Sequence, residues 1–135
     1  MAVSIFINLP VRDLEKSKAF VEALGWTINK QFTDETAASV VISDTIYAML
    51  LTHDKYRLFT DKQIVDASKS SEVLIALSQE SKEAVHKLVD AALKAGAKEA
   101  RPMQDYGFMI SRSFDDLDGH TWEIIYMDPS HVQAQ

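Results

Sequence analysis

Cysteine is absent from the sequence, so disulfide bonds and thiolate metal sites are both excluded. Only four glycines occur and all are isolated, which excludes a glycine-rich loop that would hold a phosphate. Long apolar runs are also missing, since runs such as Tyr47–Leu51 are far too short to cross a bilayer. These absences predict a protein without a membrane-spanning segment, a nucleotide-phosphate loop or a structural zinc–thiolate centre.

Positive charge is in the minority, with 14 Lys and Arg against 20 Asp and Glu and a formal net charge of −6. A nucleic-acid partner requires a basic face that neutralises phosphates, so we expect none. The N-terminal residues show no basic region followed by a long apolar stretch, which favours a cytoplasmic protein. The 135 residues are enough for one domain that buries roughly two-thirds of its unfolded surface.

The two halves of the chain are imperfect copies of each other. The first begins with the apolar run Ile5–Leu9 and the second with Val73–Leu77, an offset of 68 residues. The helical pattern that follows each run ends at Gly25 and at Gly96, an offset of 71 residues. A difference of three residues is the size of a loop insertion, so the chain is predicted to contain a duplicated strand–helix–strands unit.

The first copy is predicted to begin with a strand over Ser4–Val11. Asp13 is the expected N-cap of the helix that follows, and Gly25 supplies its left-handed stop. Three more strands are expected over residues 26–32, 38–43 and 46–52.

Between the copies, Thr60 is a possible cap for a short helix over residues 61–67. The second copy is predicted to contain a strand over residues 72–77, a helix over residues 81–94 and strands over residues 98–101, 108–114 and 121–127. Asp118-Gly119 is the strongest hairpin signal in the chain. Residues 130–135 are expected to form a frayed tail.

Several motifs follow this βαβββ order; they are Val11–Ser17, Asp118–Glu123, Asn8–Val11, Phe32–Glu35, Met49–His53 and Arg112–Phe114. With them the chain resembles the vicinal oxygen chelate superfamily, which includes glyoxalase I, bleomycin-resistance proteins, fosfomycin-resistance enzymes and extradiol dioxygenases. It is most similar to the bacterial branch labelled predicted lactoylglutathione lyase. The resemblance implies an α+β fold in which two βαβββ repeats form a cup-shaped mixed sheet with helices outside. It places repeat one at about 3–57, a connector at 58–70 and repeat two at about 71–128, and it also implies a homodimer.

The resemblance also implies where a metal would bind, at Phe6, Leu50, Leu74 and Glu123. Only Glu123 can coordinate, whereas a catalytic divalent site needs about three nitrogen or oxygen ligands. We therefore expect no metal and no cofactor.

The four histidines offer the alternative, a rebuilt site for a divalent ion such as Ni or Zn. His53 lies three residues from Leu50 and His120 three from Glu123, so strand alternation turns both away from the cup unless a bulge intervenes. His86 is expected on a helix and His131 in the tail. His53 remains the weak alternative ligand.

Alternation also predicts the walls of the cup. They are Phe6, Asn8, Ala48, Leu50, Thr52, Leu74, Ala76, Ser78, Thr121, Glu123 and Ile125. A mostly apolar wall with a few polar groups is typical of a small-molecule site, although the same side chains could simply fill a core.

Glu123 is the candidate catalytic or ligand-binding residue of this cup. An ionised carboxylate in apolar surroundings needs solvent, a proton or a cation, and Arg112 and Arg101 are candidate partners. Glu123 could contact a ligand, act as a general base or be structural. Arg112 could clamp a substrate carboxylate or form an ordinary ion pair. Trp122 alternates with Glu123 and is expected to face the helices.

Three functions remain open. The first, which we favour, is a non-metal module that binds a small amphipathic molecule in the apolar cup. The second is a metal-dependent lyase or isomerase of the glyoxalase type, or a dioxygenase, that uses Glu123 and a rebuilt His ligand. In the third, the cup is filled and the protein acts through a partner surface.

Overall fold

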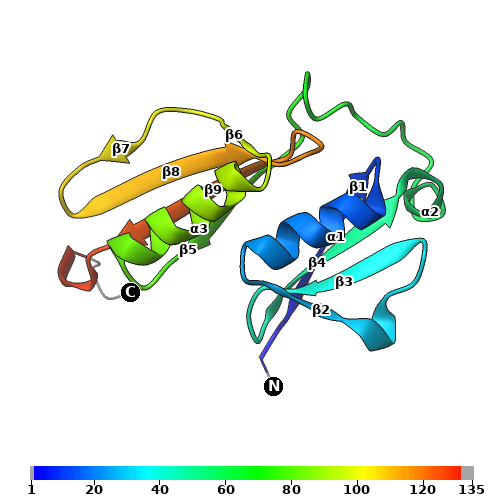
Figure 1. The fold of residues 1–135 in the computed structure, drawn as a ribbon, viewed down its shortest axis with the longest axis horizontal. Helices are drawn as coiled ribbons and strands as arrows, with labels where there is room; N and C mark the ends of the chain where they lie inside the picture. The colour runs from blue at the N-terminus through cyan, green and yellow to red at the C-terminus, as the bar shows by residue number, and fades with distance from the viewer. Residues whose placement is uncertain (1, 132–135) are drawn as a thin grey trace. The chain divides into compact units, whose positions relative to one another are not determined.

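The computed structural model describes residues 2–131, and it confirms the duplicated architecture (Figure 1). The chain divides between Val65 and Asp66 into two compact units, which we call repeat one and repeat two. Each repeat contains its own sheet with one long helix packed on it. Among the described residues, no helix combines the length and the apolar character needed to span a membrane.

Repeat one has a four-stranded mixed sheet. Its elements are β1 (Ile5–Val11), α1 (Leu14–Ala23), β2 (Thr27–Asn29), the 3-10 turn η1 (Lys30–Phe32), β3 (Ala37–Val41), β4 (Ile46–Thr52) and the short helix α2 (His53–Tyr56). The strand order is β1-β4-β3-β2, with β1 parallel to β4 and the other pairs antiparallel.

Repeat two has the same connectivity. Its elements are β5 (Leu74–Ser78), α3 (Lys82–Lys94), β6 (Lys98–Glu99), β7 (Gln104–Asp105), β8 (Met109–Asp115), β9 (Thr121–Met127) and the 3-10 turn η2 (Pro129–His131). The strand order is β5-β9-β8-β6, and β7 also pairs with β8. The parallel pair β5–β9 corresponds to β1–β4 of repeat one.

Both long helices begin at side-chain caps, of which the one at Asp13 was predicted. The Asp13 carboxylate accepts a hydrogen bond from the Lys16 backbone N–H at 3.1 Å, and the Ser81 hydroxyl accepts one from the Ala84 N–H at 3.0 Å. These contacts satisfy amide groups that have no partner within the helix. Gly25, with φ of 93°, follows the end of α1 as predicted.

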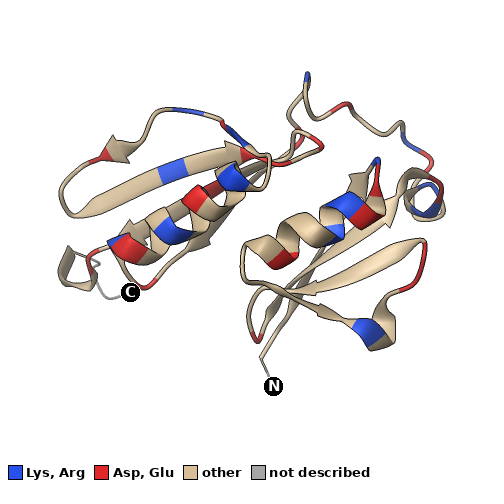
Figure 2. Cartoon of the chain, in the orientation of Figure 1, with Lys and Arg blue, Asp and Glu red and all other residues tan. Residues whose placement is uncertain are grey.

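The predicted apolar stripe of α3 is buried, with Val85 and Val89 fully enclosed. It packs on β8 and β9, where Phe114 and Ile124 have no exposed surface. The other side of α3 carries lysines interspersed with Glu83 and Asp90, which is the pattern of a solvated helix face (Figure 2).

Two predicted elements differ most from the structure. The strand expected over residues 26–32 stops at Asn29, because the Asn29 side chain accepts from the Gln31 N–H at 3.1 Å and starts η1. The helix expected over residues 61–67 is wrong: these residues are irregular, and Thr60 accepts only a local bond from the Lys62 N–H. Of the predicted tail, residues 130 and 131 belong to η2, and residues 132–135 lie outside the described chain.

Candidate functional site

The strand register of repeat two separates its sheet into two faces. Residues that pair across neighbouring strands point to the same side of a sheet. Arg112 pairs with Ile124, and the Arg112 side chain contacts α3, so these residues lie on the face that α3 covers. We call the opposite side the helix-free face. Its residues are Leu74, Ala76, Ser78, Ser111, Ser113, Asp115, Thr121, Glu123 and Ile125.

Glu123 occupies the middle of the helix-free face. It lies on β9, between Ala76 of β5 and Ser113 of β8. Its side chain is half-buried, and within residues 2–131 it has no hydrogen bond or ion pair. A half-buried carboxylate without a protein partner retains its full capacity to accept hydrogen bonds from another molecule.

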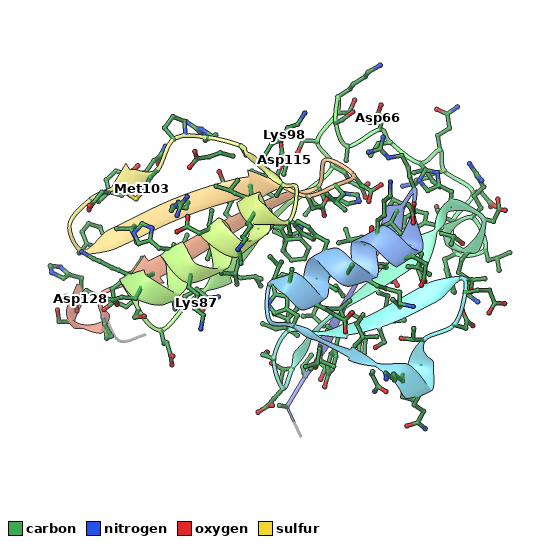
Figure 3. All side chains as sticks on the ribbon, in the orientation of Figure 1. Asp66, Lys87, Lys98, Met103, Asp115 and Asp128 are labelled. Carbon is green, nitrogen blue, oxygen red and sulfur yellow. The ribbon has the colours of Figure 1, made fainter. Side chains whose placement is uncertain are left out.

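The groups around Glu123 are apolar or carry hydroxyls. The Thr121 hydroxyl donates to the Asp115 carboxylate at 2.6 Å. Ser113 is buried, whereas Leu74 is 57% exposed at the outer strand. Lys98 pairs with Asp115 in the register of β6 and β8, and the two lie side by side at the end of these strands (Figure 3).

Arg112 does not lie beside Glu123, so the expectation that it pairs with that carboxylate or lines the cup is wrong. Its side chain is 11% exposed and its Nη1 lies 2.8 Å from the Asp90 carboxylate. A second carboxylate, on Glu99, is 3.7 Å from Nη2. Adjacent residues of a strand point to opposite faces of the sheet. Ser111 and Ser113 lie on the helix-free face, so Arg112 between them points to the α3 side. Arg101, the other candidate partner, is exposed in the segment after β6.

His86 completes the surroundings of Arg112. The Nη1 of Arg112 lies 3.1 Å from His86 Nδ1. A guanidinium only donates hydrogen bonds, so Nδ1 accepts and the imidazole proton is on Nε2. This cluster joins α3 to β8 and β6, and it gives Arg112 a role in packing the helix on the sheet.

Repeat one has its own exposed apolar surface, on the face opposite α1. The Phe6 ring stacks on the Tyr47 ring with centroids 4.8 Å apart and planes 10° apart. Asn8 and Met49 pair next to them on the same side. Phe6 is 57% exposed, as is its counterpart Leu74 in repeat two.

Leu50 and Thr52 do not share a face with Phe6, which corrects the predicted wall. Leu50 pairs with Leu9 and Ala38, all three buried on the side where α1 packs. Ala48 lies on that side too. Thr52 also has this orientation, and its hydroxyl accepts from the Lys55 N–H to cap α2. The predicted alternation of side chains within β4 is correct. However, β4 is shifted by one residue along β1 relative to the assumed pairing, so Tyr47 and Met49 lie on the side of Phe6.

The histidines occupy four separate environments. His53 is the first residue of α2, His86 binds Arg112, His120 precedes β9, and the His131 ring lies 5.3 Å from that of Phe108. Within the described part of the chain, His, Asp and Glu nowhere gather in a group of three or more that could hold a metal ion. Of the four positions that the resemblance assigns to a metal, Glu123 has a carboxylate, whereas Phe6, Leu50 and Leu74 have hydrocarbon side chains without a donor atom.

Asp116 is a half-buried polar residue that the sequence analysis did not single out. Its carboxylate accepts from the Trp122 Nε1–H at 3.0 Å and from the N–H groups of Asp118 and His120, both at 3.0 Å. Burial raises the pKa of Asp116, and the nearby His120 and the bond from Trp122 oppose this rise. The pair Asp115-Asp116 just before the turn residues Asp118-Gly119 was the sequence signal from which Asp116 could have been identified. Trp122 faces α3 as predicted.

Comparison with known proteins gives one family match in repeat one. Residues 4–43 match the family model described as bleomycin resistance protein-like N-terminal. Among curated proteins, none matches the sequence.

Solved structures match over nearly the whole chain. A hypothetical protein from S. aureus is 28% identical, with a TM-score of 0.77 over 93% of this chain and 95% of its own. A glyoxalase/bleomycin resistance protein/dioxygenase family enzyme from Burkholderia phytofirmans is 19% identical, with a TM-score of 0.76 and coverage of 93% and 99%. The fosfomycin resistance protein FosX from Mesorhizobium loti is 18% identical, with a TM-score of 0.68 and coverage of 96% and 94%. The predicted fold class is confirmed by these likenesses.

Proposed function

We propose that this chain, a member of the vicinal oxygen chelate superfamily, binds a small amphipathic molecule on the helix-free face of repeat two. The observation that supports this is the half-buried Glu123 carboxylate, which lacks a protein partner within the described residues. Burying a charge without a partner costs free energy, so a ligand that supplies a hydrogen-bond donor is stabilised there.

The surroundings of Glu123 suit such a molecule. Leu74 and Ile125 offer apolar contact on either side of the carboxylate, and the Ser78 hydroxyl adds a polar group on β5. Binding sites for small molecules are mostly apolar with a few well-placed polar groups. Leu50, Thr52 and Arg112 are not part of the proposed site, because they lie on the faces covered by α1 and α3.

The proposal requires no metal. A glyoxalase-type lyase or a dioxygenase needs a divalent ion held by about three donors. In repeat two, Glu123 has Ala76 and Ser113 beside it, and His86 is engaged with Arg112 on the opposite face. We derive no reaction step from this arrangement, and Glu123 is proposed as a ligand contact.

The experiment follows backbone amide signals by NMR during titration with 4-phenylbutan-1-ol, a neutral amphiphile. We expect saturable shifts in β5, β8 and β9, centred on Ala76, Ser113 and Glu123. A Leu74→Asp variant should weaken binding because it places a charge against the apolar body of the ligand. Lys87→Asp, on the exposed side of α3, is the control and should bind as the parent does.

A titration in which shifts appear only outside the helix-free face would overturn the proposal. The proposal would also be overturned if no saturable shifts appear with 4-phenylbutan-1-ol, 4-phenylbutylamine or 4-phenylbutanoate.

A further inference from the structure

The charges on the helix-free face are unevenly distributed. Two carboxylates, Asp115 and Glu123, and one ammonium, Lys98, point to this side. Asp115 already accepts the hydrogen bond from Thr121 at 2.6 Å and has Lys98 beside it in the register. Lys98 is exposed on β6, and β8 separates that strand from β9. Glu123 is therefore the uncompensated charge at the centre of the face.

The other cations on the helix and strands of repeat two are directed elsewhere. Arg112 is held on the α3 side by Asp90 and His86. The Lys82 ammonium donates to the Gly107 carbonyl oxygen at 3.4 Å. Lys87 and Lys94 are exposed on α3, which packs on the opposite face of the sheet.

We infer that the helix-free face selects organic cations, namely molecules with a protonated amine attached to an apolar body. This inference rests on the function proposed above and specifies its ligand. An ionised carboxylate accepts hydrogen bonds only, and a bond from an ammonium group is charge-assisted and stronger than a neutral one. The Ser113 and Ser78 hydroxyls, on the strands beside Glu123, supply acceptors for the remaining N–H groups.

The same arrangement discriminates against anions. A ligand carboxylate or phosphate meets Glu123 without a neighbouring Arg or Lys from the described part of repeat two, and like charges at close range repel. The apolar body gains from contact with Leu74 and Ile125 whatever the charge of the head group. The charge on the ligand therefore sets the order of affinity within a series that shares one apolar body.

The test compares three probes with the same skeleton: 4-phenylbutylamine, 4-phenylbutan-1-ol and 4-phenylbutanoate. Calorimetric titration at neutral pH and low salt measures the dissociation constant of each. We expect the amine to bind about tenfold more tightly than the alcohol, which is the order expected for a hydrogen bond to a charged group. The carboxylate should bind more weakly than the alcohol.

Two variants locate the source of the preference. Glu123→Gln removes the charge and keeps the shape, so the amine and the alcohol should then bind equally. Glu83→Gln makes the same chemical change on α3, on the other side of the sheet, and should keep the parent preference. Raising the salt concentration to about 0.5 M should reduce the preference in the parent.

The possible failures are distinguishable. Equal binding of all three probes would overturn the inference about charge and leave the proposed binding function intact. A preference for the amine that persists in Glu123→Gln would show that another group selects the cation, which also overturns it. If none of the probes binds, the proposed function itself is wrong.

Discussion

Gly119, in the β8–β9 hairpin, packs closely against the backbone of Ala67 and Ser68 near the start of repeat two. Its φ is 92°, and a Cβ at this position would lie 2.5 Å from the Ser68 backbone nitrogen and 2.8 Å from the Ala67 carbonyl carbon. Side chains on L-residues rarely tolerate this backbone conformation, and backbone atoms cannot move aside as a flexible side chain can. Asp118-Gly119 was predicted as a turn from sequence, but this contact was not.

We predict that Gly119→Ala lowers the free energy of unfolding of repeat two by about 2–5 kcal/mol, as the sum of left-handed backbone strain and overpacking. Gly107→Ala is the matched control, because Gly107 has a φ of 82° and nothing within 4 Å of its Cβ position. It should cost only the strain, about 1–2 kcal/mol. Urea unfolding followed by Trp122 fluorescence in a Trp26→Phe background measures both, and equal costs would contradict the steric account.

At the scale of the element, α3 is stabilised by its N-cap as well as by its apolar stripe. The Ser81 side chain satisfies the Ala84 N–H, and the Arg112 cluster joins the exposed side of the helix to the sheet. We predict that Ser81→Ala destabilises repeat two by about 1 kcal/mol, because the amide loses its partner. Ser81→Asp should retain most of the stability.

The same Trp26→Phe background and urea titration report this change at Trp122. Ser130→Ala is a suitable control in η2, where the hydroxyl of the exposed Ser130 donates to Asp128. A loss as large in Ser130→Ala as in Ser81→Ala would argue against a specific role for the cap.

Local signals predicted the elements well where one residue determines the geometry. The cap at Asp13, the stop at Gly25 and the strand over residues 121–127 are all confirmed. The irregular segment 61–67 was mistaken for a helix because Thr60 and the polar run after it resemble a capped first turn. No apolar stripe supports that segment, and short helices without tertiary packing are marginal.

The candidate site was less predictable, because it depends on register between strands. Alternation within a strand can be read from sequence, but the pairing of Phe6 with Tyr47 cannot, since it depends on how two distant segments align. A shift of one residue placed Leu50 on the α1 face and left Met49 beside Asn8. Glu123 was correctly expected on the same side as Leu74 and Ala76, because the β5–β9 register matches the assumed one.

At the scale of the whole molecule, the duplication explains why the first strand of each repeat lies at an edge of its own sheet. The resemblance seen in the motifs agrees with the family match over residues 4–43, and the solved structures share the fold of the whole chain. β1 and β5 are the edge strands of their sheets and occupy equivalent places in the two copies. Ile5 and Val73, which correspond in the two copies, are 53% and 51% exposed.

Exposed apolar edge strands favour association with another strand, and soluble proteins usually cover or charge them. We therefore predict that the chain forms a homodimer in which the β1 and β5 edges are covered. Analytical ultracentrifugation should show a dimer for the parent, and Ile5→Lys combined with Val73→Lys should shift it towards monomer.

Leu58→Lys is the matched control, because Leu58 is 74% exposed but lies after α2, outside both edge strands. Because the substitution also adds a positive charge but does not touch an edge strand, it should leave the mass unchanged. A monomeric parent, or a dimer that survives the double substitution, would contradict this mode of association.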